Sequence, residues 1–173
     1  MVTALRKILL IVAFLAVSIQ LAGSAEVPAS IERPGVEAGP TQVSVGIWMV
    51  DITNIDSAQQ NFTADIAVVL RWKDARLAHT GAGLAHYALD QIWTPRVSIA
   101  NETNSVVRKL SESAEVEPDG TVLYRQRYVG SFTQPLRLQS FPFDRQAFRI
   151  QFVAVRYQRN EVTFVPDQNW IRD

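Results

Sequence analysis

The sequence predicts an all-β protein built as an antiparallel β-sandwich, and three observations support this fold class. In the stretch from Phe62 to Trp72 every second residue is apolar, which is the period of a half-buried strand. Turn-forming residues recur at short intervals along the chain. Apolar residues at helical spacing are almost absent. Many short strands separated by turns are typical of two packed antiparallel sheets.

The other elements follow from the same patterns. Apolar residues alternate from Val43 to Met49, which predicts a first strand, and residues 51–60 are polar and rich in turn formers. Residues 75–87 contain two glycines and read as a loop or a short helix. The run Glu117-Pro118-Asp119-Gly120 predicts a tight hairpin turn, because Asp-Gly accepts positive φ. Further strands are expected at 97–99, 106–110, 114–117, 122–128, 148–152 and 162–165.

The N-terminal residues resemble an export signal. Arg6 and Lys7 precede an apolar run from Ile8 to Leu21, and Gly23-Ser24-Ala25 offers small residues for cleavage. We therefore expect a signal peptide at 1–25, a loose leader at 26–40 and one exported domain at 41–173, with an uncleaved anchor as the alternative.

Composition excludes several classes of function. Seventeen basic and seventeen acidic side chains balance, so nothing indicates nucleic-acid binding. The chain has no cysteine, so an exported domain would depend on its core rather than on disulfides. His79 and His86 lack partners at metal-ligand spacing, and the sequence contains neither a Gly-x-Ser-x-Gly elbow nor a phosphate loop. We expect no metal, no cofactor and no enzymatic activity.

The run Phe141-Pro142-Phe143-Asp144 is the most distinctive stretch. Proline fixes its own φ and favours an extended residue before it, so this loop should be stiff and carry two large aromatic side chains. From these residues alone, the aromatic rings either plug the domain's own core or dock onto another structure.

This run and three other motifs, in the same order, resemble one family. They are Trp72-Lys73-Asp74, Trp93-Thr94-Pro95 and the segment from Gly120 to Tyr128. Together they are similar to the extracellular ligand-binding domain of pentameric ligand-gated ion channels, the Cys-loop receptor superfamily, from about Val43 to Asp173. Eukaryotic members close the aromatic loop with two cysteines, where this chain has Gln134 and Phe148. The chain is thus similar to the prokaryotic members, and we expect packing and Pro142 to close its loop.

The resemblance implies an immunoglobulin-like sandwich of about ten strands, truncated here at its C-terminal end, with four membrane helices following it. It implies a ring of five identical subunits on the extracellular or periplasmic side of the membrane, with a small-molecule ligand bound between subunits. An isolated, truncated sandwich would have unpaired strand edges, so we expect the chain alone to be poorly stable.

The resemblance also suggests ligand-binding positions. Family members commonly have tryptophan where this chain has Ala67 and Val155, so a cation–π cage for amines is largely missing. Several arginines favour a carboxylate or another anion as ligand, although solvated or interfacial arginines are the simpler reading. The positions carried over are Asn101, Glu102, Arg156 and Tyr157 on one subunit face, and Arg71 and Tyr124 on the other.

The family places the aromatic loop at the membrane end of the sandwich, beside the turn at residues 54–59. Phe141, Pro142, Phe143 and Asp144 would then couple ligand binding to the pore, with Arg149 as a candidate partner of Asp144. Two alternatives stay open: a secreted soluble binding protein of the same fold, and an unrelated carbohydrate-binding or enzymatic β-sandwich.

Overall fold

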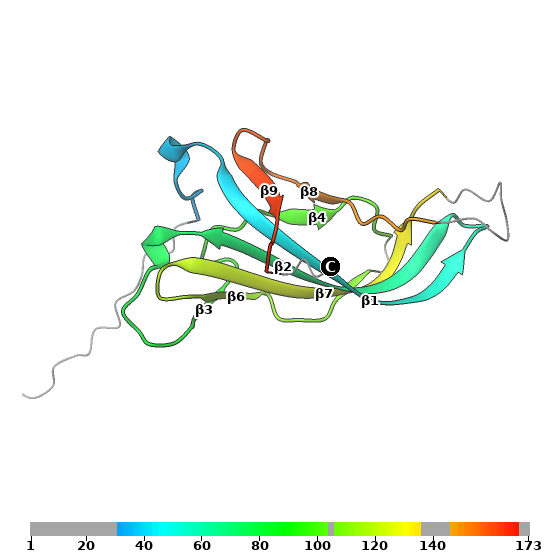
Figure 1. The fold of residues 1–173 in the computed structure, drawn as a ribbon, viewed down its shortest axis with the longest axis horizontal. Coiled ribbons are helices and arrows are strands. Elements are labelled where there is room, and N and C mark those ends of the chain that lie inside the picture. The colour runs from blue at the N-terminus through cyan, green and yellow to red at the C-terminus, as the bar shows by residue number, and fades with distance from the viewer. Residues whose placement is uncertain (1–30, 104–105, 136–145, 170–173) are drawn as a thin grey trace, which may run out of the picture.

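The computed structural model describes residues 31–103, 106–135 and 146–169 (Figure 1). The predicted signal peptide and the Phe141-Pro142-Phe143-Asp144 motif lie outside these ranges. Two short 3₁₀ helices occur, η1 (Val36–Ala38) and η2 (Ala75–Leu77). The strands are β1 (Thr41–Asp56), β2 (Asn61–Lys73), β3 (Ala85–Ala88), β4 (Val97–Ile99), β5 (Val107–Arg108), β6 (Ser113–Val116), β7 (Thr121–Thr133), β8 (Phe152–Ala154) and β9 (Val162–Pro166).

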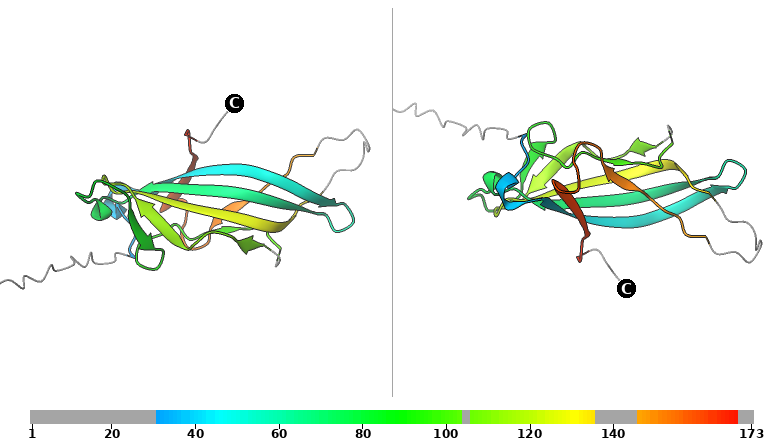
Figure 2. Two further views of the ribbon diagram at one scale, coloured as in Figure 1. Left: turned by 90° about the horizontal axis from the view of Figure 1, so that it is seen from below. Right: turned by 90° about the horizontal axis from the view of Figure 1, so that it is seen from above.

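The strands form two sheets, which confirms the predicted β-sandwich. The larger sheet has seven strands in the order β3-β6-β7-β2-β1-β9, with β5 also paired to β7, and the smaller sheet pairs β4 with β8. The smaller sheet lies across one face of the three long strands β1, β2 and β7 (Figure 2). Nine strands fall within the described residues, and the count of ten stays a prediction.

One strand pair departs from the predicted antiparallel arrangement. Six of the seven pairs are antiparallel, but β9 runs parallel to β1, from Thr41 opposite Val162 to Val45 opposite Pro166. The chain reaches β9 from β8, which belongs to the other sheet, so no hairpin fixes the direction of β9 beside β1.

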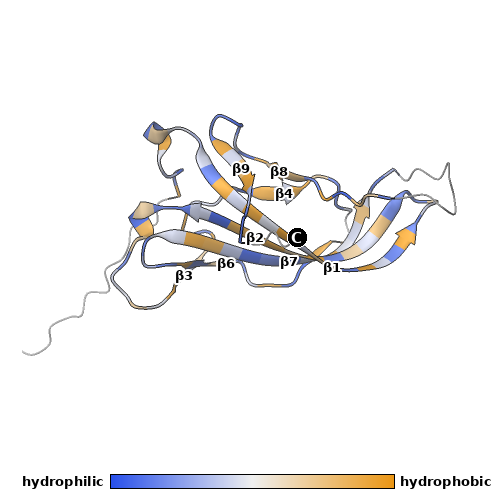
Figure 3. Cartoon of the chain, in the orientation of Figure 1, coloured by the Kyte–Doolittle hydropathy of each residue, from blue (hydrophilic) through white to orange (hydrophobic). Residues whose placement is uncertain are grey.

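The core lies between the sheets and follows the predicted alternation. Hydrophobic and hydrophilic residues alternate along the long strands (Figure 3). The even-numbered residues of β2 from Phe62 to Trp72 face the core and are buried, as are Val122 and Tyr124 on β7. Trp93 is also buried, so both tryptophans of the sequence motifs pack in the core.

Strand β1 is longer than the sequence predicted. Residues 51–56, which we expected to form a turn, continue the strand through irregularities between Met49 and Asp51 and between Ile52 and Asn54. The polar residues are tolerated because this part of β1 is largely exposed. The turn itself is short, and the Asp56 carboxylate accepts hydrogen bonds from the backbone N–H groups of residues 58 and 59.

Two other differences between the predicted and the observed strands occur at the edges of the sheets. Residues 85–88, expected in a loop, form β3 on the edge of the larger sheet. The predicted strand at 148–152 is regular only from Phe152 onward, although Phe148 and Ile150 still pack against the core. Beyond Val45, β1 has no partner on its second side among the described strands, and Ile47 is 43% exposed.

The hairpin turn before β7 is confirmed. Gly120 has a φ of 83° and donates its backbone N–H to the Glu117 carbonyl at 2.8 Å. A side chain could not replace the glycine hydrogen, because a Cβ would lie 2.5 Å from the carbonyl oxygen of Asp74.

The hairpin turn before β7, η1 and η2 gather at one end of the long axis, which we call the leader end (Figure 1). The β1–β2 turn and the end of β7 lie at the other, the base end.

Candidate functional site

Asn101, predicted to contact ligand, is a bridging residue at the base end. Its side-chain Nδ2 donates to the carbonyl oxygens of Thr133 at 3.0 Å and Arg149 at 2.8 Å. Its Oδ1 accepts from the backbone N–H of Gln151 at 3.0 Å. All the polar atoms of this amide are therefore engaged within the chain.

Glu102 and Arg156 are the predicted positions with the most accessible side chains. Both are exposed, and the backbone of Glu102 forms an isolated bridge with that of Phe132. Arg156 lies in the bend that follows β8. Either side chain is free to meet solvent or another molecule without repacking of the core.

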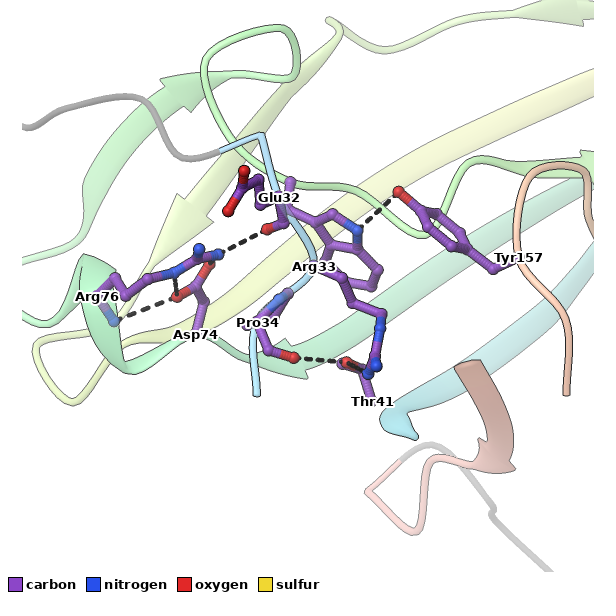
Figure 4. Close-up of polar contacts among 8 residues, drawn as sticks. Glu32, Arg33, Pro34, Thr41, Asp74, Arg76 and Tyr157 are labelled. Atoms are coloured by element: carbon purple, nitrogen blue, oxygen red, sulfur yellow. Dashed lines mark hydrogen bonds and ion pairs between the residues drawn. The ribbon is translucent and has the colours of Figure 1, made fainter. Parts of the chain in front are cut away.

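Tyr157 is half-buried in an aromatic cluster near the leader end. Its hydroxyl oxygen accepts a 2.9 Å hydrogen bond from the indole N–H of Trp93, which Figure 4 shows as a dashed line. The ring centroids of Trp93 and Tyr157 lie 5.6 Å apart, and Trp93 meets Trp72 edge-on at 5.8 Å. The cluster anchors the segment after β8 to the core.

Arg71 lies on the outer face of the larger sheet, away from the core. Its Nε is 3.3 Å from the carboxylate of Asp167, whose side chain is only 3% exposed. Ser44 is the β1 partner of Arg71, so this ion pair reaches over β1 to the segment after β9. The Arg71 Nε and the Asp167 Oδ2 are both buried, but their relative orientation does not form a hydrogen bond. Arg71 is thus partly committed to holding three neighbouring segments together.

Tyr124 faces the opposite side of the same sheet. It is 9% exposed, its hydroxyl donates to the Glu112 carboxylate at 3.3 Å, and it accepts from the side chain of Gln126 at 3.2 Å. Burial raises the pKa of Tyr124 to about 12. Arg71 and Tyr124 therefore do not meet within one chain.

The remaining arginines of the outer face are paired. Arg127 forms a bidentate contact with Asp65, and this hydrogen-bonded guanidinium lowers the pKa of the Asp65 carboxyl. Arg125 contacts Glu115. Ala67 lies between Arg127 and Trp48 in the register of the sheet, so Trp48, 49% exposed, occupies the same face. The predicted arginine-rich face exists, but most of its charge is balanced within the chain.

At the base end, Gln134 joins segments that the sequence left unconnected. Its backbone N–H donates to the carbonyl of Gln60 at 2.8 Å, which links the end of β7 to the β1–β2 turn. Its side chain bonds to residues 147 and 149. Phe148 packs on Phe62 with ring centroids 4.8 Å apart, as expected for closure by packing. The role of Gln134 was missed, although a long amide at a position of the family's cysteines was the available signal.

The leader end is held by charged groups. The guanidinium of Arg76 grips the buried carboxylate of Asp74 through two hydrogen bonds of 2.7 and 2.8 Å, and this contact raises the pKa of Arg76. It also donates to the backbone carbonyl of Glu32 at 2.8 Å (Figure 4). Close by in the sheet, Lys73 pairs with Asp119 and lowers the pKa of that carboxyl to about 2.

The described residues hold no group of three histidine, aspartate or glutamate side chains that could bind a metal ion. Within the same ranges, no helix has the length and apolar character needed to cross a membrane.

The chain belongs to the family of neurotransmitter-gated ion-channel ligand-binding domains, which matches residues 29–171. This membership confirms the resemblance that the motifs indicated.

Individual relatives support the same family assignment. The chain is 27% identical over 138 residues to a proton-gated ion channel of Gloeobacter violaceus, covering 78% of this chain and 38% of the channel. It is also 27% identical over 140 residues to gamma-aminobutyric acid receptor subunit alpha-2 of Homo sapiens and of Bos taurus, covering 77% of this chain and 31% of each receptor subunit. The chain thus spans about a third of the length of these relatives. The relatives are channel and receptor proteins, so the prediction that the chain is not an enzyme is confirmed.

Proposed function

We propose that the chain is the extracellular or periplasmic ligand-binding domain of a ligand-gated ion-channel subunit. The family match over residues 29–171 carries this proposal. The complete subunit would be exported, continue into membrane-spanning helices and assemble with four identical copies around a pore. Ligand binding would favour one of two arrangements of the ring by its higher affinity for that arrangement.

We place the ligand between neighbouring subunits. Arg156, next to Tyr157 near the leader end, is the exposed predicted residue best placed to meet the ligand, whereas Glu102 is exposed next to Asn101 at the base end. The facing subunit would offer the outer face of its larger sheet, with Arg71 near the leader end. Tyr157 and Tyr124, whose polar groups are bonded within the chain, would support this site rather than touch the ligand, and the amide of Asn101 is engaged at the base end.

A small anion fits this site better than an amine does. The guanidinium of Arg156 is an exposed donor, whereas Trp93 and Tyr157 are packed together and cannot form an open aromatic cage. Small carboxylates are therefore the first compounds to test, with protons and amines as comparisons.

Coupling to the pore would use Phe141, Pro142, Phe143 and Asp144 together with the β1–β2 turn. Two observations on the described residues next to these segments support this assignment. The Asp56 carboxylate caps the turn. The backbone N–H of Gln134, at the end of β7, donates a hydrogen bond to the carbonyl of Gln60, the last residue of the turn. Movement of either segment would consequently be transmitted to the other.

Voltage-clamp recording of the complete subunit in oocytes tests the function. Pro142→Ala and Phe143→Ala should lower the maximal ligand-evoked current severalfold while the half-maximal concentration changes little, because loop stiffness serves coupling. Pro118→Ala is the matched control, because this exposed proline lies in the turn at the leader end. Unchanged maximal current with weakened affinity would contradict the coupling role.

Membrane attachment is a separate test. We expect the coding region beyond Asp173 to encode four apolar stretches of about 20 residues each. A protein recovered entirely from the soluble exported fraction would favour the secreted binding protein instead. Specific retention on a glycan array would favour the carbohydrate-binding alternative.

A further inference from the structure

We propose that the side-chain amides of Gln134 and Asn101 form a non-covalent clamp that closes the aromatic loop where eukaryotic relatives use a disulfide. We call these two amides the amide clamp. Its structural part stands on hydrogen bonds of described residues, whereas its role in positioning the coupling loop rests on the proposed function.

Gln134 supplies the first half of the amide clamp. Its Nε2 donates to the carbonyl of Ala147 at 2.6 Å, and its Oε1 accepts from the backbone N–H of Arg149 at 2.6 Å. These two residues flank Phe148, which occupies the second cysteine position of the resemblance. The Gln134 side chain, at the first cysteine position, thus bonds to both residues that flank Phe148 at the second cysteine position.

Asn101 supplies the other half. It bonds to the carbonyl of Arg149 and to the N–H of Gln151, and its Nδ2 also reaches the Thr133 carbonyl at the end of β7. The backbone of Arg149 is therefore held on both sides, its N–H by Gln134 and its carbonyl by Asn101.

The two amides replace a missing strand partner. A side-chain amide has one carbonyl and N–H donors, as a peptide unit does. The amide clamp continues a ladder that regular pairing begins, since Ala100 N–H donates to the Gln151 carbonyl at 2.7 Å and Ile99 pairs with Phe152. This explains why residues 147–151 alternate between exposed and half-buried without belonging to a strand.

Gln134 also connects the amide clamp to the β1–β2 turn, because its own N–H donates to Gln60. The residue therefore joins three segments: the end of β7, the turn, and residues 147–149. Residues 136–145, which contain the aromatic motif, lie in the sequence between the two segments that the amide clamp joins. We assign Gln134 as a positioning residue for that motif.

Backbone hydrogen exchange in the complete, membrane-reconstituted protein tests the amide clamp. Gln134→Ala should lower the protection factor of the Arg149 N–H by about fivefold or more, the equilibrium effect of one ordinary hydrogen bond. Gln151→Ala is the matched control, since Gln151 takes part in this ladder through its backbone groups. It should leave the protection of Arg149 unchanged.

Gln134→Glu separates a specific bond from a general loss of packing. A protonated carboxyl group has one donor and one acceptor and can reproduce both bonds. A carboxylate can accept from the Arg149 N–H but cannot donate to the Ala147 carbonyl, whose oxygen repels it and turns the side chain away from Arg149. Protection of Arg149, corrected for the intrinsic exchange rate at each pH, should therefore be low at pH 7 and recover at about pH 4, near the ordinary pKa of glutamate. Gln134→Ala should show no such recovery.

Unchanged protection of Arg149 in Gln134→Ala would overturn the amide clamp. So would equal losses at core amides such as that of Ile66 combined with no pH-dependent recovery in Gln134→Glu. Current recording then tests the positioning role, since Gln134→Ala should reduce maximal current more than affinity. Altered exchange without any ligand-gated current in the wild type would reject the proposed function and leave the amide clamp standing.

Discussion

The two ends of the sandwich are held by different chemistry. At the leader end, ion pairs and an aromatic cluster fix the chain, with Asp74 gripped by Arg76 and Trp93 bonded to Tyr157. At the base end, the neutral amides of Gln134 and Asn101 hold residues 147–151, beside the packed rings of Phe62, Phe132 and Phe148. Buried aromatic rings stabilise through lost water contact and are hard to rearrange, whereas a neutral hydrogen bond contributes little net free energy and exchanges readily.

This difference matches the separate tasks that the proposed function gives the two ends. An anchored leader end keeps the ligand-facing strands in register. At the base end, the segments that the neutral amides hold can shift between two arrangements at small cost in free energy, while the rings of Phe62 and Phe132 stay packed. Three experiments would break or sharpen the comparison.

Trp93→Ala should have the largest effect. Removing a buried tryptophan costs about 3–5 kcal/mol, and here it also leaves the Tyr157 hydroxyl without its donor. Urea unfolding of the exported protein would measure the loss. Trp48→Ala is the matched control, because Trp48 is 49% exposed, and a surface substitution changes stability by roughly 0.5 kcal/mol. Equal losses for the two variants would mean that the aromatic cluster does not anchor the leader end.

Alkaline titration should have an intermediate effect. The folded-state pKa of Tyr124 is raised from 10.0 to about 12, so its stabilising contribution is complete below pH 10 and is lost as pH rises towards 12. The full loss corresponds to roughly 2–3 kcal/mol. Tyr124→Phe should flatten the decline of unfolding free energy over this range. A residual slope is expected, because burial also raises the pKa of Tyr128. An unaltered slope would contradict the assignment.

Asp119→Asn should have the smallest effect. The exposed pair with Lys73 lowers the pKa of Asp119 to about 2, so the contribution is present above the unfolded pKa of 3.8 and is lost as pH falls to about 2. We expect a small drop in melting temperature at neutral pH that disappears in about 1 M salt. The amide clamp does not titrate, so the same salt and acid should leave the relative protection of Arg149 unaltered. A salt-sensitive base end would remove the contrast between the two ends.

Much of the fold followed from local patterns in the sequence. The alternation from Phe62 to Trp72 and the Asp-Gly turn reflect physics within a few residues, and the structure confirms both. The parallel pairing of β9 with β1 has no such local cause, because it depends on how the chain crosses between sheets. The length of β1 was missed because its polar residues lie in an exposed part of the strand, where they read as a turn.

The predicted site was harder to read from sequence. Residue types indicated that Asn101, Tyr157 and Arg71 can bind ligands, but the same groups also satisfy partners within the chain. Which of the two occurs depends on neighbours distant in sequence, such as Asp167 beside Arg71. Gln134 shows the converse: its place at a cysteine position of the family was the available signal, but its partners at residues 147 and 149 are evident only in the structure.

The amide clamp has one consequence for how this protein is made. A loop closed by a disulfide needs an oxidising compartment and a thiol oxidant, and a reductant can open it. Here the sequence contains no cysteine, and the junction is made of Gln134, Asn101 and backbone groups. The base end can therefore assemble as soon as the strands meet, at any redox potential, and thiol reagents have nothing there to act on.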